Sequence, residues 1–232
     1  MKQLCTAAAL LFSIVIMAQT KQTRNVGNFS GISSATGIKV KITQGSENAV
    51  VVSSSKDELV DNIKTEVDKN GILKIYYKNP NKFNWNKNRN VQLNAYVTYK
   101  SINSLTASSG SSMESTEAVH GDALSIDVSS GAQMEVDIAT TDCNINMSSG
   151  AVAKVGGNAA NVKIDASSGS SFRGTNLTAE NCKATLSSGA EVKMEVTKKL
   201  SASASSGGSF KYKGNPEIEK KTTSSGGEVK AM

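Results

Sequence analysis

Two aspartates, Asp127 and Asp165, have a spacing that suggests carboxylate chemistry. Asn146 lies midway between them, 19 residues from each. If successive segments of this length stack as strands, about 4.8 Å per layer places the two aspartate backbones roughly 9.6 Å apart. Inverting glycosidases hold their acid and base carboxyl groups about 6.5–9.5 Å apart. One hypothesis is therefore a polysaccharide lyase or glycoside hydrolase built on stacked strands.

The surrounding residues argue against catalysis. The same position in other segments is occupied by Thr106, Thr185 and Ser203, whereas a sugar-cleaving site needs convergent acid, base and orienting groups. His120 is the sole histidine, and the sequence places no nucleophile beside it for a Ser-His-Asp relay. We expect no enzymatic activity, with glycan cleavage as the alternative.

A second set of residues at the same spacing offers charge. Glu114 and Glu135 come first, and a series of cations follows: Lys154, Arg173, Lys193, Lys211 and Lys230. Stacked in layers, these side chains would form a row that is acidic at one end and basic at the other. Such a row could dock an anionic ligand, although solvated faces carry similar rows without function. We take Lys154, Arg173, Lys193 and Lys211 as the candidate anionic-ligand face.

A sequence repeat determines where these residues lie in the fold. Ser-Ser-Gly occurs seven times, and its glycines are 21, 19, 19, 20, 18 and 19 residues apart. A short fixed period is typical of a solenoid, in which each coil buries its inner face by stacking on its neighbours. We expect the triplet to form a corner, because glycine adopts backbone conformations that other residues avoid.

Aligning the repeats on their glycines gives columns, each containing the residues at one position of successive coils. Apolar columns, such as Ile126, Ile145 and Ile164, alternate with polar ones. This period of two is that of a β-strand. Each coil then holds two short strands joined through the corner, and a polar stretch such as Gly156–Asn158 leads to the next coil.

The fold class is therefore all-β, a parallel β-helix of roughly 19-residue coils. The drifting spacing favours a right-handed helix with variable loops, as does the right-handed preference of parallel crossovers. Residues 19–100 lack the triplet but show strand patterns, with a hairpin signal at Asn70-Gly71. A short helix is expected near Asp57–Val60, capped by Ser55 or Asp57, and a polar loop over Lys78–Asn90. We expect this region to form a β-layer that covers the first coil.

The domain organisation follows from these patterns. Residues 1–18 carry a lysine, an apolar run and a final alanine, which is typical of a secretory signal peptide. We expect residues 19–100 to form the N-terminal strand region and residues 101–232 the coils, packed as one continuous unit. The mature protein would be exported, to the periplasm, the outer surface or the medium, with no transmembrane segment.

The charge and cysteine content of the chain limit the kinds of partner and cofactor that we expect. The net charge of +6 is spread over lysine-rich turns, so we expect no nucleic-acid partner. Cys143 and Cys182 fall in one inward column with Val162 between them, about 9.6 Å apart, which is too far for a disulfide. They also point inward, which excludes a zinc site, and no other pattern indicates a cofactor.

The chain resembles a known family in several segments. They are Phe29–Ile32, Gly37–Gly45, Asn70–Ile75 and the serial Ser-Ser-Gly coils. Together they are similar to the head GIN domain family, described as putative auto-transporter adhesin heads of exported bacterial proteins. The resemblance implies an all-β fold with β-helical coils and an extracytoplasmic location, and it supplies no catalytic residues.

Two function classes follow. The favoured one is a noncatalytic, exported adhesin-like module that binds a glycan, a cell-envelope component or another protein through a flat face of Ser, Thr and Lys. The alternative is the glycan-cleaving enzyme.

Overall fold

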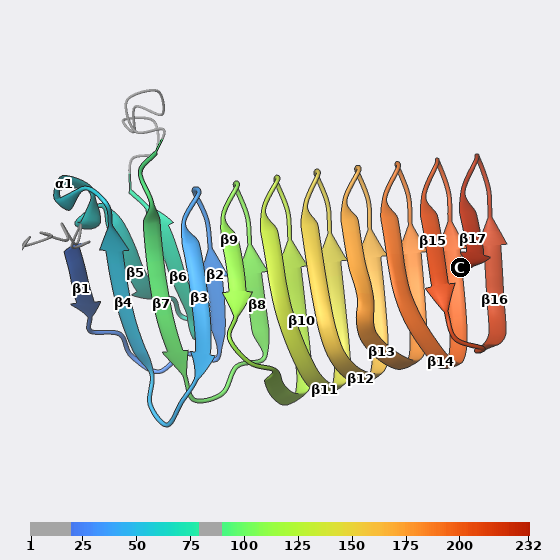
Figure 1. Ribbon diagram of the computed structural model, residues 1–232, viewed down its shortest axis with the longest axis horizontal. Coiled ribbons are helices and arrows are strands. Elements are labelled where there is room, and N and C mark those ends of the chain that lie inside the picture. Colours follow the sequence, from blue (N-terminus) through green and yellow to red (C-terminus); the bar gives the residue numbers. More distant parts are fainter. Residues whose placement is uncertain (1–19, 79–89) are drawn as a thin grey trace, which may run out of the picture.

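The protein is a long, flattened solenoid in the computed structural model, which describes residues 20–78 and 90–232. Coils stack side by side along the long axis (Figure 1), and about seven turns are present. All 17 strands of the described residues are joined in one hydrogen-bonded sheet. The predicted parallel β-helix is confirmed. Its right-handed sense stays a prediction.

The repeat coils are built from ten strands with parallel neighbours. The strands are β8 (Ser104–Ala107), β9 (Ser112–Ser115), β10 (Val119–Val128), β11 (Gln133–Met147), β12 (Val152–Ala166), β13 (Ser171–Leu186), β14 (Glu191–Ala204), β15 (Ser209–Lys213), β16 (Glu217–Thr223) and β17 (Glu228–Ala231). The predicted register is confirmed, because Ile145 pairs with Ile126 on one side and Ile164 on the other. All three are buried, at 1% exposure or less.

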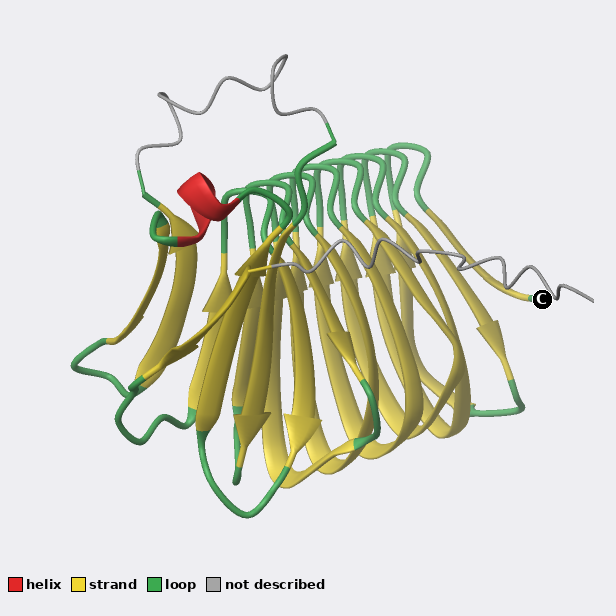
Figure 2. Cartoon of the chain, turned by 60° about the vertical axis from the view of Figure 1, so that its left-hand side comes forward, coloured by secondary structure: helices red, strands yellow, loops and turns green. Residues whose placement is uncertain are grey.

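The expected division of each coil into two short strands was wrong. The polar stretch Gly156–Asn158 does not interrupt the strands, because it lies inside β12 and pairs with residues 137–139 of β11. From β10 on, most strands run through the bend opposite the corner, so that each coil has two legs. The outgoing leg follows a corner, as residues 133–139 do, and the returning leg precedes the next corner, as residues 142–147 do. The legs form two walls with the core between them (Figure 2).

The Ser-Ser-Gly triplets form the corners, which line up along one edge of the solenoid (Figure 2). Ser149 and Gly150 both have positive φ, 54° and 69°. Two successive residues of this kind reverse the chain tightly, as in a type I′ turn. The Gly150 amide donates a 3.0 Å hydrogen bond to the carbonyl of Ser168 in the next coil, so each corner is tied to its neighbour.

The N-terminal region covers the first Ser-Ser-Gly coil as expected, and it does so by extending the solenoid. β2 (Gly31–Ser34) pairs in parallel with β8, and β3 (Lys39–Gln44) pairs in parallel with β9. Thr36 and Gly37, with φ of 57° and 71°, form the corner between them. This corner was not predicted from the sequence because it lacks the Ser-Ser-Gly motif.

At this end of the solenoid, two more strands stack in parallel on β2 and β3, and antiparallel strands then close the edge. The remaining elements are β1 (Thr20–Arg24), β4 (Ala49–Ser54), α1 (Asp57–Val60), β5 (Ile63–Val67), β6 (Ile72–Tyr77) and β7 (Leu93–Tyr99). β5 and β6 form the hairpin predicted from Asn70-Gly71. The helix is where it was expected, but Lys56 and not Ser55 or Asp57 occupies its N-cap position. The predicted polar loop falls largely on residues 79–89, and the signal peptide on residues 1–18, both outside the described residues.

Candidate ligand-binding face

The outer wall formed by the outgoing legs carries the predicted basic residues. Strand pairing aligns Glu135 with Lys154, and then Arg173, Lys193 and Lys211 in successive coils. They point outward because their strand neighbours, such as Phe172 and Val192, are fully buried. The structure therefore brings the four predicted site residues into one row, called here the basic row.

Most cations of the basic row are already paired. Lys154 contacts the carboxylate of Glu135. The Nζ atoms of Lys193 and Lys211 lie 2.9 Å and 3.5 Å from the same oxygen, Glu191 Oε1. Hydrogen bonding by Lys193 is the main cause that lowers the pKa of Glu191. Sequence reasoning missed Glu191, which stands two residues before Lys193 and so points to the same side of the strand.

Arg173 differs from its neighbours. Its side chain is exposed, and among the described residues it makes neither an ion pair nor a hydrogen bond. A guanidinium presents five donors in a planar fork that suits carboxylate, sulfate or phosphate oxygens. The basic row thus offers one uncommitted cation beside three lysines that already share carboxylates.

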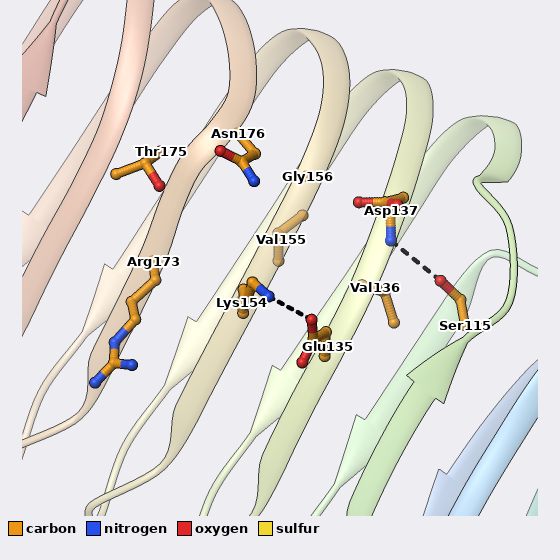
Figure 3. Close-up of a pocket in the computed structure, with 10 residues that line it drawn as sticks. All are labelled: Ser115, Glu135, Val136, Asp137, Lys154, Val155, Gly156, Arg173, Thr175 and Asn176. Atoms are coloured by element: carbon orange, nitrogen blue, oxygen red, sulfur yellow. Dashed lines mark hydrogen bonds and ion pairs between the residues drawn. The ribbon is translucent and has the colours of Figure 1, made fainter.

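A depression of about 440 Å³ opens on this wall next to Arg173 (Figure 3). Its lining residues come from four neighbouring coils: Ser115, Glu135, Val136, Asp137, Lys154, Val155, Gly156, Arg173, Thr175 and Asn176. Gly156 lies at its centre, paired with Asp137 on one side and Asn176 on the other. Because glycine has no side chain, the outward column that contains Asp137, Gly156 and Asn176 has a gap at Gly156.

The aspartates considered for catalysis lie on the other wall. Asp127, Asn146 and Asp165 stack in one column, as predicted. Asn146 Nδ2 donates a 2.9 Å hydrogen bond to Asp127 Oδ1, and Lys163 Nζ lies 2.9 Å from Asp165 Oδ2. A depression of about 360 Å³ beside them is lined by Ser, Thr, Asn, Asp and small apolar residues and Met147, with no arginine or aromatic residue among them.

Other candidates for chemistry are dispersed. His120 is exposed on β10, and its imidazole has no hydrogen-bond partner among the described residues. Within that same part of the chain, no three His, Cys, Asp or Glu side chains gather closely enough to hold a metal ion. Cys143 and Cys182 are buried and free, as predicted.

The returning wall also carries an amide ladder that sequence reasoning missed. Asn161 Nδ2 donates to Asp142 Oδ1 and Asn181 Nδ2 donates to Asn161 Oδ1, both at 2.9 Å. The recurrence of these residues at intervals of 19 and 20 is the signal that could have revealed it. These hydrogen bonds link three successive coils and so stabilise the stack.

No helix in the described ranges is long and apolar enough to span a membrane.

Comparison with solved structures agrees with this architecture. A putative adhesin from Bacteroides fragilis NCTC 9343 superposes with a TM-score of 0.82 at 18% identity, covering 93% of this chain and 97% of that one. A putative adhesin from Parabacteroides distasonis ATCC 8503 has a TM-score of 0.71 at 15% identity, covering 93% and 97%. A putative lipid binding protein from the same strain has a TM-score of 0.68 at 16% identity, covering 92% and 96%. At these identities the likeness shows the fold alone.

None of the curated proteins matches the chain at a significant level. The family model described as "Putative auto-transporter adhesin, head GIN domain" matches residues 28–216, which contain strands β2 to β15. The chain belongs to this adhesin head GIN domain family.

Proposed function

We propose that the protein is a noncatalytic, exported binding module that attaches to an anionic glycan of a cell envelope or surface. The observation that carries this proposal is the uncommitted guanidinium of Arg173 within the basic row. A long rigid wall with a repeat of about 4.8 Å per coil presents ligand groups at fixed intervals, which suits a polymer better than a small molecule.

The family and the structural neighbours support attachment, since both bear adhesin descriptions. The apolar run of residues 1–18 supports export. Catalysis has less support, because Asp127 and Asp165 are each engaged by a neighbour and no orienting arginine lines their depression.

The electrostatic part of the binding should be modest and salt-sensitive. Exposed charges are screened over about 8 Å at physiological ionic strength. Glu191 also competes with any anionic ligand for Lys193 and Lys211, because both lysines already contact its carboxylate. We therefore assign the larger part of the binding energy to Arg173 and a smaller part to Lys154, Lys193 and Lys211.

A glycan array tests the proposal. The chain from residue 19 onward should bind acidic glycans, and Arg173→Ala should lower binding at least five-fold without changing the melting temperature. Lys183→Ala is the matched control, because Lys183 is an exposed cation on the returning wall. If no acidic glycan binds, or if both variants lose binding equally, the proposed function is wrong.

A further inference from the structure

The depression over Gly156 lies where the strand pairing of an otherwise regular wall is interrupted. Lys154 pairs with Arg173 and Gly156 with Asn176, so β13 uses one more residue than β12 over this step. An extra residue of this kind is a β-bulge, which re-aims side chains and recurs next to functional sites. Here the alternation of inward and outward residues breaks, and Thr175 and Asn176 are both exposed.

Glycine at position 156 keeps the depression open. A Cβ there would lie 2.2 Å from Asp137 Oδ1 and 3.6 Å from the Asn176 Cβ. The Asp137 carboxylate therefore leans over the Gly156 backbone in space that any other residue would fill. In Figure 3, Asp137 and Asn176 flank Gly156 on its two sides, and Arg173 comes from the strand of Asn176 with its guanidinium directed along the wall away from Gly156.

Four polar side chains around this gap have no partner within the described residues. They are the Asp137 carboxylate, the Arg173 guanidinium, the Thr175 hydroxyl and the Asn176 amide, and all four residues are exposed. The amide ladder on the returning wall behaves differently, since the Asn161 and Asn181 side chains each hydrogen-bond to a neighbour. The remaining charges, Glu135 and Lys154, neutralise each other.

These groups define the chemistry of a ligand. A carboxylate only accepts hydrogen bonds, so Asp137 requires hydroxyl or N–H donors. Arg173 only donates and favours an anion. Asn176 and Thr175 can do both. A polyhydroxylated ring that bears a carboxylate satisfies all four groups, and a volume of about 440 Å³ lies within the range of about 300–1,000 Å³ typical of small-ligand sites.

We propose that the depression over Gly156 binds one uronic acid unit of a glycan, with its hydroxyls on Asp137 and Asn176 and its carboxylate on Arg173. This inference rests on the proposed function and specifies where and what the wall recognises. Lys193 and Lys211 of the basic row then extend the contact along the polymer on one side of this unit, toward the C-terminal coils.

The test uses calorimetry on the chain from residue 19 onward with a uronic acid trisaccharide and its carboxyl-reduced, neutral counterpart. We expect Gly156→Ala to weaken trisaccharide binding at least ten-fold, because the new Cβ displaces Asp137. Gly121→Ala is the matched control, since a Cβ there meets no atom closer than 3.8 Å, and it should stay within two-fold. Melting temperatures establish that each variant is folded.

Asp137→Asn separates recognition of hydroxyls from simple charge attraction. Removing a negative charge would strengthen binding of an anion held by charge alone. If hydroxyls are recognised, the amide should weaken binding several-fold, and the carboxyl-reduced sugar should bind at least ten-fold more weakly than the acid.

The outcomes distinguish this inference from the proposed function. Acidic glycans that bind the array while Gly156→Ala leaves their affinity unchanged would overturn the inference and leave the proposed function standing. Absence of trisaccharide binding, or stronger binding by Asp137→Asn, would also overturn it. Failure of every acidic glycan to bind would overturn both.

Discussion

Lys193 Nζ lies 2.9 Å from Glu191 Oε1, two residues earlier on the same strand. Lys211 in the next coil approaches the same oxygen at 3.5 Å. The lysines lower the pKa of Glu191 below its ordinary value of 4.5. The carboxylate therefore stays ionised at neutral pH, and the basic row carries less free positive charge than its sequence indicates.

Removing this carboxylate should release both lysines. We expect Glu191→Gln to raise affinity for an anionic glycan about two- to ten-fold at low salt, with a steeper loss of affinity as salt increases. Glu219→Gln is the control, because Glu219 pairs with Lys199 at 2.8 Å on the returning wall. Titrations at two salt concentrations check this. Unchanged or weaker binding by Glu191→Gln would show that the lysines do not take part.

The core prediction concerns Ile145, which is 1% exposed between Ile126 and Ile164. Ile145→Asp buries a carboxylate with no partner between two apolar side chains, so we expect a loss above about 4 kcal/mol and an unfolded protein. The neighbouring, exposed Asn144 supplies the control, Asn144→Asp. Urea unfolding measures both. A cooperative, near-parental transition for Ile145→Asp would contradict the observed register.

Alanine substitutions at two glycines with positive φ distinguish the cost of backbone strain from the cost of a steric clash. A Cβ on Gly150 meets nothing within 4 Å, so Gly150→Ala should cost only the positive-φ penalty of about 1–2 kcal/mol. Gly157 has φ of 93°, and a Cβ there would lie 2.1 Å from the Ile138 carbonyl oxygen. Gly157→Ala should therefore cost clearly more. Equal midpoints for the two variants in urea unfolding would contradict the close stacking of β11 and β12.

The two thiols should be inert in the folded protein. Burial raises the pKa of Cys143 and of Cys182 to about 12, which leaves almost no thiolate for alkylation at neutral pH. Mass spectrometry should find neither cysteine alkylated in the native state and both alkylated after unfolding without reductant. A Cys143–Cys182 bridge would be inconsistent with Val162 standing between them.

The regular repeat made the buried core of the coils predictable from the sequence. Columns such as Ile126, Ile145 and Ile164 were predictable because strand alternation and a period near 19 residues place equivalent residues in register. The corner at Thr36-Gly37 was not, since a β-branched threonine in a left-handed conformation is uncommon and carries no Ser-Ser-Gly signature.

The details of the candidate site depend on features of single coils, which the repeat pattern does not reveal. The sequence placed Arg173 and Lys193 in one row, but whether a cation is free depends on neighbours such as Glu191 in an adjacent column. The bulge in β13 left only a weak trace, a 20-residue interval between Gly169 and Gly189. Which side chains an extra residue re-aims is decided by packing in three dimensions.

If the protein is a noncatalytic binding module, it should bind an acidic glycan without cleaving it. The chain from residue 19 onward is incubated with its strongest glycan-array ligand, and new reducing ends and unsaturated products are measured beside the bound fraction. We predict saturable binding that Arg173→Ala weakens and no product over prolonged incubation. Product that forms with the parent protein and disappears in Asp127→Asn or Asp165→Asn would contradict a noncatalytic role and identify a glycan-cleaving enzyme.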